Sequence, residues 1–199
     1  MKRLGVAAFL ALTVVGTAFA AAAPIEIFAE QPLVTYRDDP HIKGRVAGAR
    51  MGTVVLLQRR ECGRTEWEEF SRAITNDEGQ WQAFTTLLKT TDVRARVGAN
   101  TSEILRVTVR PWVSLTQSGK RWTVRVMANE YFRTRARLER FDRASGRWAL
   151  AKLVRLERAY AQSVGTVTFR ARRGTNMRAS FAKPNACYAG AVSRIVSAR

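Results

Sequence analysis

Apolar and charged residues alternate with a period of two along much of this chain, and this restricts the possible folds more than any other feature. In RWTVRVMA, Trp122, Val124 and Val126 share one phase, while Arg125 falls on the other. Successive side chains of a strand point to opposite faces of a sheet, so the pattern describes strands that are buried on one side only. Turn clusters such as TNDEGQ and ASGR separate several stretches of this kind. We therefore predict an all-β fold of antiparallel sheets.

The predicted strands form two series of seven. The first series is 25–36, 42–48, 53–60, 66–75, 79–86, 92–98 and 103–110, and the second is 112–117, 121–128, 134–142, 147–157, 165–172, 176–183 and 191–198. Seven short strands in roughly 85 residues are typical of an immunoglobulin-like sandwich. Pro111 separates the two series, because a proline ends a strand. We expect two tandem sandwiches, residues 24–111 and 112–199, and a loop at Leu153–Val164.

One stretch of sequence occurs in both series. LQRRECGRTEW and LERFDRASGRW each place a leucine ten residues before a tryptophan, Leu57 before Trp67 and Leu138 before Trp148. The first copy contains Cys62, and the second has no cysteine. The repeat indicates that the two halves share one architecture.

This layout resembles the tandem immunoglobulin-like domains of small exported actinobacterial proteins. The features that carry the resemblance are G-x-W at Gly79-Gln80-Trp81, R-A-R at Arg94-Ala95-Arg96 and V-R-P at Val109-Arg110-Pro111. The second half departs from the pattern, because it has no G-x-W and TVTF follows its Gly165. The resemblance implies a fold and a compartment, and it carries no activity with it.

The N-terminus has the composition of a secretory leader. Lys2 and Arg3 precede the uncharged stretch Leu4–Ala23, and Ala18-Phe19-Ala20 is a small-x-small cleavage site. We predict a signal peptide over residues 1–20 and a secreted protein, free or associated with the cell wall. The alternative is an uncleaved anchor, because about twenty apolar residues can span a bilayer.

The two cysteines lie in different halves. Cys62 follows the third predicted strand of the first half, and Cys187, in KPNACYAG, follows the sixth of the second half. Loops between consecutive antiparallel strands lie at alternate poles of a sandwich, so both cysteines are expected at the junction. An exported protein is expected to oxidise such a pair. We predict a Cys62–Cys187 disulfide that clamps the halves together; the alternative is two separate thiols.

The sequence offers little for catalysis. His41 is the only histidine, so a zinc site would lack a second imidazole. Glu66 and Glu68 share a strand face, and paired carboxylates are the groups that a glycoside hydrolase uses. We expect them to be solvent-facing strand residues instead, and we predict no enzyme activity, metal or cofactor. Trp67, Trp81, Trp122 and Trp148 are expected in the two cores, and Trp112 at the interface between them.

The charge is distributed unevenly. Residues 24–111 contain 13 Lys and Arg against 12 Asp and Glu, whereas residues 112–199 contain 19 against 4, a net charge of +15. Such an excess on a small domain is more than solubility requires, and guanidinium groups bind phosphate and sulfate oxygens through a planar fork. The candidate anion-binding residues are Arg125, Arg133, Arg135, Arg137, Arg155, Arg170, Arg172, Arg173 and Arg178.

These arginines suggest a polyanionic partner outside the cell. The candidates are anionic cell-wall polymers, anionic lipid headgroups and extracellular DNA, all of which would bind with strong salt dependence. The alternative is that the arginines form a passive solvated surface and that the chain binds another surface protein or a carbohydrate. An exposed groove at Tyr131 and Phe132 would favour carbohydrate. We expect a structural or adhesive module.

Overall fold

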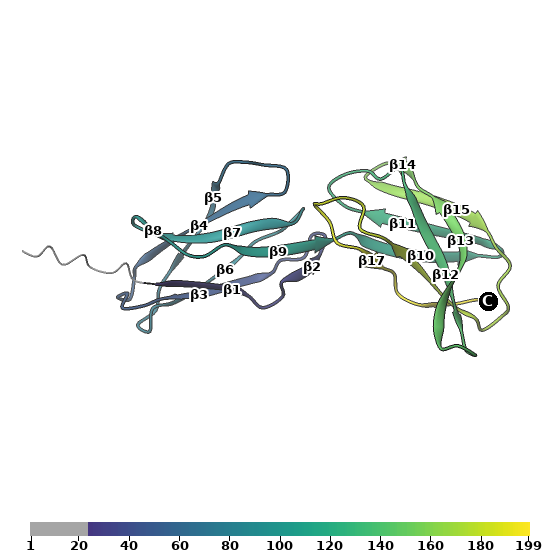
Figure 1. Ribbon diagram of the computed structural model, residues 1–199, viewed down its shortest axis with the longest axis horizontal. Coiled ribbons are helices and arrows are strands. Elements are labelled where there is room, and N and C mark those ends of the chain that lie inside the picture. Colours follow the sequence, from purple (N-terminus) through teal and green to yellow (C-terminus); the bar gives the residue numbers. More distant parts are fainter. Residues whose placement is uncertain (1–23) are drawn as a thin grey trace, which may run out of the picture.

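The structure, a computed structural model, describes residues 24–199, and these form an all-β molecule whose two halves lie end to end (Figure 1). The predicted all-β class is confirmed. The predicted signal peptide, residues 1–20, lies outside the described residues. Over residues 24–199, no helix has the length and apolarity needed to cross a bilayer.

The first half folds into two sheets. The smaller has the strand order β1-β3-β6, formed by β1 (Ile25–Ala29), β3 (His41–Val46) and β6 (Gln80–Phe84). The larger has the order β2-β9-β7-β4-β5, formed by β2 (Leu33–Thr35), β9 (Leu105–Arg110), β7 (Thr91–Val97), β4 (Val54–Glu61) and β5 (Glu68–Ile74), with β8 (Asn100–Thr101) beside β7. Only β2 and β9 pair in parallel. The predicted strand 25–36 is therefore two strands, β1 and β2, in different sheets.

The second half also folds into two sheets. One has the order β10-β11-β15-β14, formed by β10 (Trp112–Ser118), β11 (Arg121–Met127), β15 (Gln162–Thr168) and β14 (Glu157–Ala159). The other has the order β13-β12-β16-β17, formed by β13 (Arg147–Arg155), β12 (Arg135–Asp142), β16 (Asn176–Phe181) and β17 (Ala191–Val192), with β18 (Val196–Ser197) beside β16.

The segment Leu153–Val164 is not a loop, and that prediction is wrong. β13 continues to Arg155, the chain crosses to the other sheet at the buried Leu156, and β14 then pairs with β15. Gly165 permits the crossing, because a Cβ on this residue would overlap the carbonyl oxygen of Arg155. The sequence obscured the crossing because the segment carries three charged residues, which hide its apolar phase.

Both halves contain a β-bulge at the same place in the repeated stretch. The register between β4 and β5 shifts after Leu57, which leaves Phe70 as an extra residue in β5. The register between β12 and β13 shifts after Leu138, which leaves Ala151 as an extra residue in β13. An extra residue reverses the faces of the side chains beyond it.

The bulges turn two tryptophans away from the cores. Trp67 and Trp148 lie beyond the extra residue and are only half-buried, so the prediction that they pack in the cores is wrong. Trp81 and Trp122 are core residues as predicted, with 4% and 0% of their surface exposed. Trp112, expected at the interface, is 43% exposed.

The apolar core of the second half extends into the first half. Its cluster of buried residues includes Trp122, Leu138 and Tyr188, and also Leu87 and Val109 from the first half. A separate cluster, formed by residues such as Ile42, Leu57 and Val93, fills the first half alone. The end of the first half therefore packs as part of the core of the second half.

Candidate functional site

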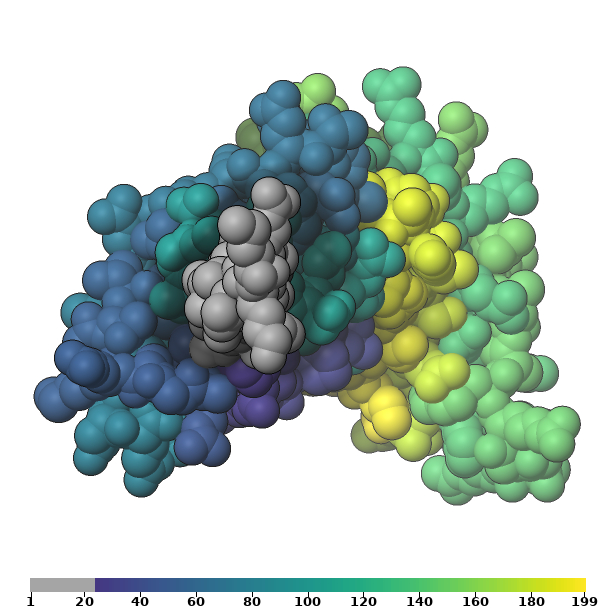
Figure 2. All heavy atoms as spheres, turned by 60° about the vertical axis from the view of Figure 1, so that its left-hand side comes forward, coloured from purple at the N-terminus to yellow at the C-terminus, as the bar shows by residue number. Residues whose placement is uncertain are grey.

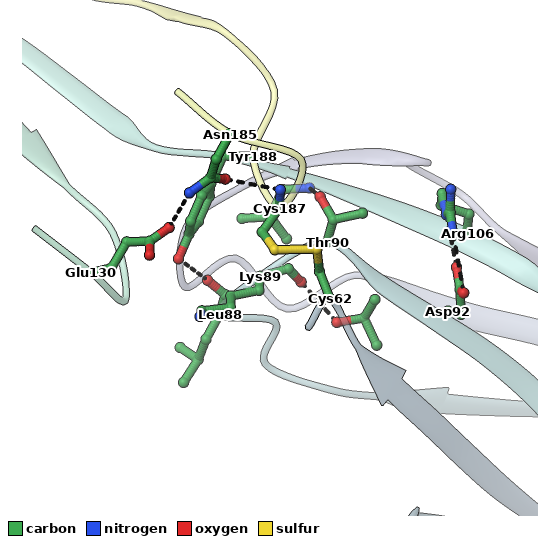
Figure 3. The surroundings of a disulfide bond; sticks show 12 residues. Cys62, Leu88, Lys89, Thr90, Asp92, Arg106, Glu130, Asn185, Cys187 and Tyr188 are labelled. Carbon is green, nitrogen blue, oxygen red and sulfur yellow. Dashed lines mark hydrogen bonds and ion pairs between the residues drawn. A yellow bond between two sulfur atoms is a disulfide. The ribbon is translucent and has the colours of Figure 1, made fainter. Parts of the chain in front are cut away.

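A disulfide between Cys62 and Cys187 joins the two halves, as predicted (Figure 3). Their Cα atoms are 5.3 Å apart, and no cysteine of the described chain is free. Cys62 follows β4 and Cys187 follows β16, so each lies at the pole that faces the other half. Backbone hydrogen bonds surround the bridge: Thr90 N–H donates to Cys187 O (3.0 Å), and Cys62 N–H donates to Thr90 O (2.9 Å).

Tyr188 adds a second connection across the junction. Its hydroxyl donates to Leu88 O (3.2 Å) in the first half and accepts from Asn129 N–H (3.2 Å) in the second. Burial raises the pKa of the Tyr188 hydroxyl above its ordinary value. In the space-filling view, the C-terminal segment (yellow) lies against the first half, which agrees with the bond from Ala189 N–H to Val109 O (Figure 2). A disulfide, several hydrogen bonds and apolar packing therefore hold the two halves together at the junction.

Acidic partners balance the arginines near the junction in the first half. Asp92 on β7 accepts from Arg106 Nε (2.7 Å) and from Arg60 (3.0 Å). The hydrogen bond from Arg106, followed by that from Arg60, lowers the pKa of the Asp92 carboxyl below its ordinary value. Within residues 24–199, six of the eight ion pairs lie in the first half, and the other two share Glu139.

The outward-turned tryptophans form the same stack in both halves. The Arg94 guanidinium lies 4.2 Å from the centre of the Trp67 ring, and the Arg178 guanidinium lies 4.2 Å from the centre of the Trp148 ring. Arg94 and Arg178 occupy the central strands β7 and β16, next to the repeated stretch on β4 and β12. The repeat therefore includes a third strand, which in both halves contributes an arginine that stacks on the tryptophan.

The two stacks differ in the charge of the group that holds the arginine. Arg94 Nε donates to the neutral Gln58 (2.9 Å), whereas Arg178 Nε donates to the carboxylate of Glu139 (2.8 Å). Arg137 Nε lies 3.2 Å from the same carboxylate, which is nearly buried. Two of the predicted anion-binding residues, Arg137 and Arg178, thus have an internal partner.

The nine predicted arginines do not form a single patch. The outer face of the β13-β12-β16 sheet carries Arg135, Arg137, Arg155 and Arg178, with Arg133 just before β12. Arg125 lies on β11 of the other sheet, where it donates to Thr116 (3.3 Å). The exposed connection between β15 and β16 carries Arg170, Arg172 and Arg173. The arginines instead gather at the two ends of β12.

The first group, which we call the junction-side cluster, consists of Arg133, Arg135, Arg155 and Arg158. Arg135 and Arg155 are exposed and lie directly opposite each other in the β12–β13 register. A hollow beside them is lined by Arg133, Arg155, Arg158 and one acidic residue, Glu157. Like charges in directly opposite positions destabilise a sheet. Four guanidinium groups therefore concentrate positive charge where a single carboxylate is present.

This cluster lies at the end of β12 that is nearer to the first half. Glu130, in the segment that leads to β12, accepts from the side chain of Asn185 (2.7 Å), two residues before Cys187 (Figure 3). The β12–β13 hairpin lies at the other end, away from the junction (Figure 1).

The second group, the far-end cluster, consists of Arg143, Arg172 and Arg173. These side chains line a hollow together with Phe141 and Asn176. Phe141 contacts Trp148 with ring centres 5.4 Å apart, so the hollow continues the outer face that carries the Arg178 stack. The far-end cluster occupies the hairpin end of β12.

Sequence equivalence relates the far-end cluster to the junction of the first half. Arg143 has the place of Cys62 in the repeated stretch. Two residues before the stacked arginine, β7 has Asp92 and β16 has Asn176. The pole that receives the next half in the first copy is therefore open and basic in the second copy.

The other candidate residues do not assemble into a site. Phe132 is buried and Tyr131 lies under Arg158, with the guanidinium 4.3 Å from the ring centre, so no groove of two exposed aromatic rings forms there. Glu66 is exposed, and Glu68 is paired with Arg59 (2.6 Å). His41 Nδ1 lies 3.4 Å from Glu30. Residues 24–199 contain no group of three His, Cys, Asp or Glu that could hold a metal ion.

Sequence reasoning missed Arg143 and Arg158, which complete the two clusters. Arg143 lies in a turn, and Arg158 lies in β14, within the segment predicted to be a loop, so period-two alternation was applied to neither. The sequence matches no protein-family model and no curated protein.

Proposed function

We propose that this chain is an exported, non-enzymatic structural or adhesive module of two immunoglobulin-like units, whose basic second half binds an anionic polymer of the cell surface. The observation that carries the proposal is the opposed pair Arg135–Arg155 within the junction-side cluster. Two guanidinium groups in directly opposite positions on a sheet repel each other, and this carries a cost in stability. A bound anion removes that cost.

The contrast between the halves supports the proposal. Arginines near the junction of the first half have acidic partners, Asp92 for Arg60 and Arg106. Within the second half, Glu139 is the one carboxylate that pairs with arginine within 4.0 Å, and it holds Arg137 and Arg178. Arg133, Arg135, Arg155 and Arg158 at one end of β12, and Arg143, Arg172 and Arg173 at the other, have no carboxylate within that distance, so their donors are available to an external partner.

Phosphate- or sulfate-bearing polymers suit this surface. A guanidinium group offers a rigid fork of donors that matches two oxygens of one phosphate or sulfate. Cell-wall polymers, anionic lipid headgroups and DNA present such groups at regular spacing. The half-covered Tyr131 and buried Phe132 favour this charge-based recognition over carbohydrate stacking.

The test is binding of the mature chain, residues 21–199, to purified cell wall, to duplex DNA and to phosphatidylglycerol vesicles across a salt series. We expect the logarithm of affinity to fall linearly with the logarithm of salt concentration, with a slope of about −0.9 per neutralised phosphate for DNA. The variant R133Q/R135Q/R155Q should reduce that slope by about 2–3. A matched control, R121Q/R125Q/R194Q, removes three charges of the same half that line neither arginine hollow, and it should change the slope much less. Absence of binding at low salt, or equal effects of the two variants, would contradict the proposal.

A further inference from the structure

The two arginine clusters of the second half lie on one outer face, joined by a single strand. β12 has eight residues, and at about 3.3 Å per residue it separates the clusters by roughly 25 Å. The junction-side cluster adjoins the start of β12, and the far-end cluster adjoins its hairpin end. We propose that they are two subsites for one linear polyanion that lies along β12. This inference rests on the proposed function and adds the form of the ligand.

The face between the clusters is suited to a chain that passes over it. Arg137 is half exposed, and Arg178 lies over Trp148 at its middle. Glu139, which would otherwise repel an anion here, is nearly buried and is neutralised by both arginines. Positive groups therefore continue from one cluster to the other without an exposed carboxylate on this part of the strand.

The far-end cluster has the features of a subsite of its own. Arg143 comes from the β12–β13 hairpin, while Arg172 and Arg173 come from the β15–β16 connection, so two separate loops direct guanidinium groups into one hollow. Asn176 and Thr175 add polar groups to its lining. Asp142 is next to Arg143, but it accepts from the Ser145 hydroxyl (2.7 Å) and Ala144 N–H (3.1 Å) within the hairpin.

A linear polymer gains from the separation of the subsites. Once one cluster holds the chain, binding at the other becomes intramolecular, and such linkage raises affinity by up to about 10²–10⁴. A short anion reaches only one cluster at a time and gains nothing from the second. The structure thus favours a flexible chain longer than β12 over small phosphate or sulfate ions.

The experiment compares tripolyphosphate with long-chain inorganic polyphosphate by calorimetric titration of the mature chain at fixed ionic strength. We expect two tripolyphosphate ions per wild-type chain, and long-chain polyphosphate should bind at least about 10-fold more tightly. R143Q/R172Q/R173Q and R133Q/R135Q/R155Q should each leave one tripolyphosphate site and abolish most of the advantage of the long polymer. R121Q/R125Q/R194Q should preserve both sites and the advantage.

The outcomes separate this inference from the proposed function. If neither probe binds at low salt, the anionic-polymer function itself is overturned. If long-chain polyphosphate binds with the affinity of tripolyphosphate, or if the far-end variant behaves like the control, the two-subsite inference is overturned while the function stands. Circular dichroism and thermal unfolding of each variant test whether the fold is intact, and we expect exposed Arg→Gln changes to preserve it, so that a loss of binding is attributable to the cluster.

Discussion

The two copies of the repeated stretch share a bulge, an outward tryptophan and a stacked arginine. They differ at one end of their central strands, which is covered in the first copy and exposed in the second. In the first copy the end of the central strands carries Asp92 and Cys62, and the second half closes over it. In the second copy the same end carries Asn176 and Arg143 and faces solvent. The comparison shows how one architecture serves both as an internal connector and as an external surface, through a few residues at one pole.

The largest expected effect comes from breaking the closed end of the first copy. The double variant C62S/C187S should lower the free energy of unfolding by about 4–5 kcal/mol, because the bridge closes a loop of 125 residues and restricts the unfolded chain. Urea unfolding with and without a reductant measures the difference. Reductant should destabilise the wild type and leave the variant unchanged; a loss below about 1 kcal/mol would mean that the packing of Leu87 and Val109 holds the halves together without the bridge.

A smaller effect is expected at the charge network of the same end. D92N leaves Arg60 and Arg106 without their carboxylate and should lower the free energy of unfolding by about 2 kcal/mol at pH 7. Hydrogen bonds to charged groups contribute about 1.5–3 kcal/mol each, and both arginines are partly exposed.

The reverse change in the second copy, N176D, places a carboxylate beside the far-end cluster and should weaken polyanion binding.

The pH dependence of D92N follows from the pKa of Asp92. Its pKa is below the ordinary 3.8 in the folded chain, so its contribution is complete above about pH 3.8 and disappears as the pH falls through the folded value. The stability difference between wild type and D92N should therefore be constant from pH 7 to about pH 5 and shrink below pH 3.8. A difference that does not shrink at all as the pH falls below 3.8 would assign the effect to packing.

The smallest effect tests whether the two stacks are equivalent. W67A and W148A should each lower the free energy of unfolding by about 1–2 kcal/mol, of which the arginine contact contributes about 0.5–1 kcal/mol. Thermal unfolding measures both variants. Losses that differ by more than about 1 kcal/mol would show that the shared geometry hides different energetics, with the charge of Glu139 against Gln58 as the cause.

The disulfide was predictable because it depends only on the pole at which each loop lies, although two of the predicted strands, 25–36 and 147–157, are each divided between two sheets. Cys62 and Cys187 reach the junction by the parity of the loops in which they lie, and an error of a few residues in a strand boundary leaves that parity unchanged. The outward positions of Trp67 and Trp148 were not predictable, because a single extra residue, Phe70 or Ala151, reverses the face of everything beyond it. No local pattern marks that residue.

The candidate surface was predictable only in part. The sequence identified the basic half and the outward residues of β12, including Arg135 and Arg137. It did not show that Glu139 neutralises Arg137, because that carboxylate lies on the same polar phase as the arginines. The sequence also did not show that Arg125 belongs to the opposite sheet. Alternation predicts which side chains of a strand share a face, but it does not predict which of the two sheets contains the strand.

The bridge at the junction also determines how the molecule would respond to a pulling force between residues 24 and 199. Tension would pass from Cys62 directly to Cys187 and bypass the chain between them, which includes every strand from β5 to β16. Only the segments outside the loop could lengthen, at no more than about 3.3–3.6 Å per residue. In a protein with this bridge, the chain would extend by a limited length under load. Further force would then act on the disulfide bond while most of the strands remained folded.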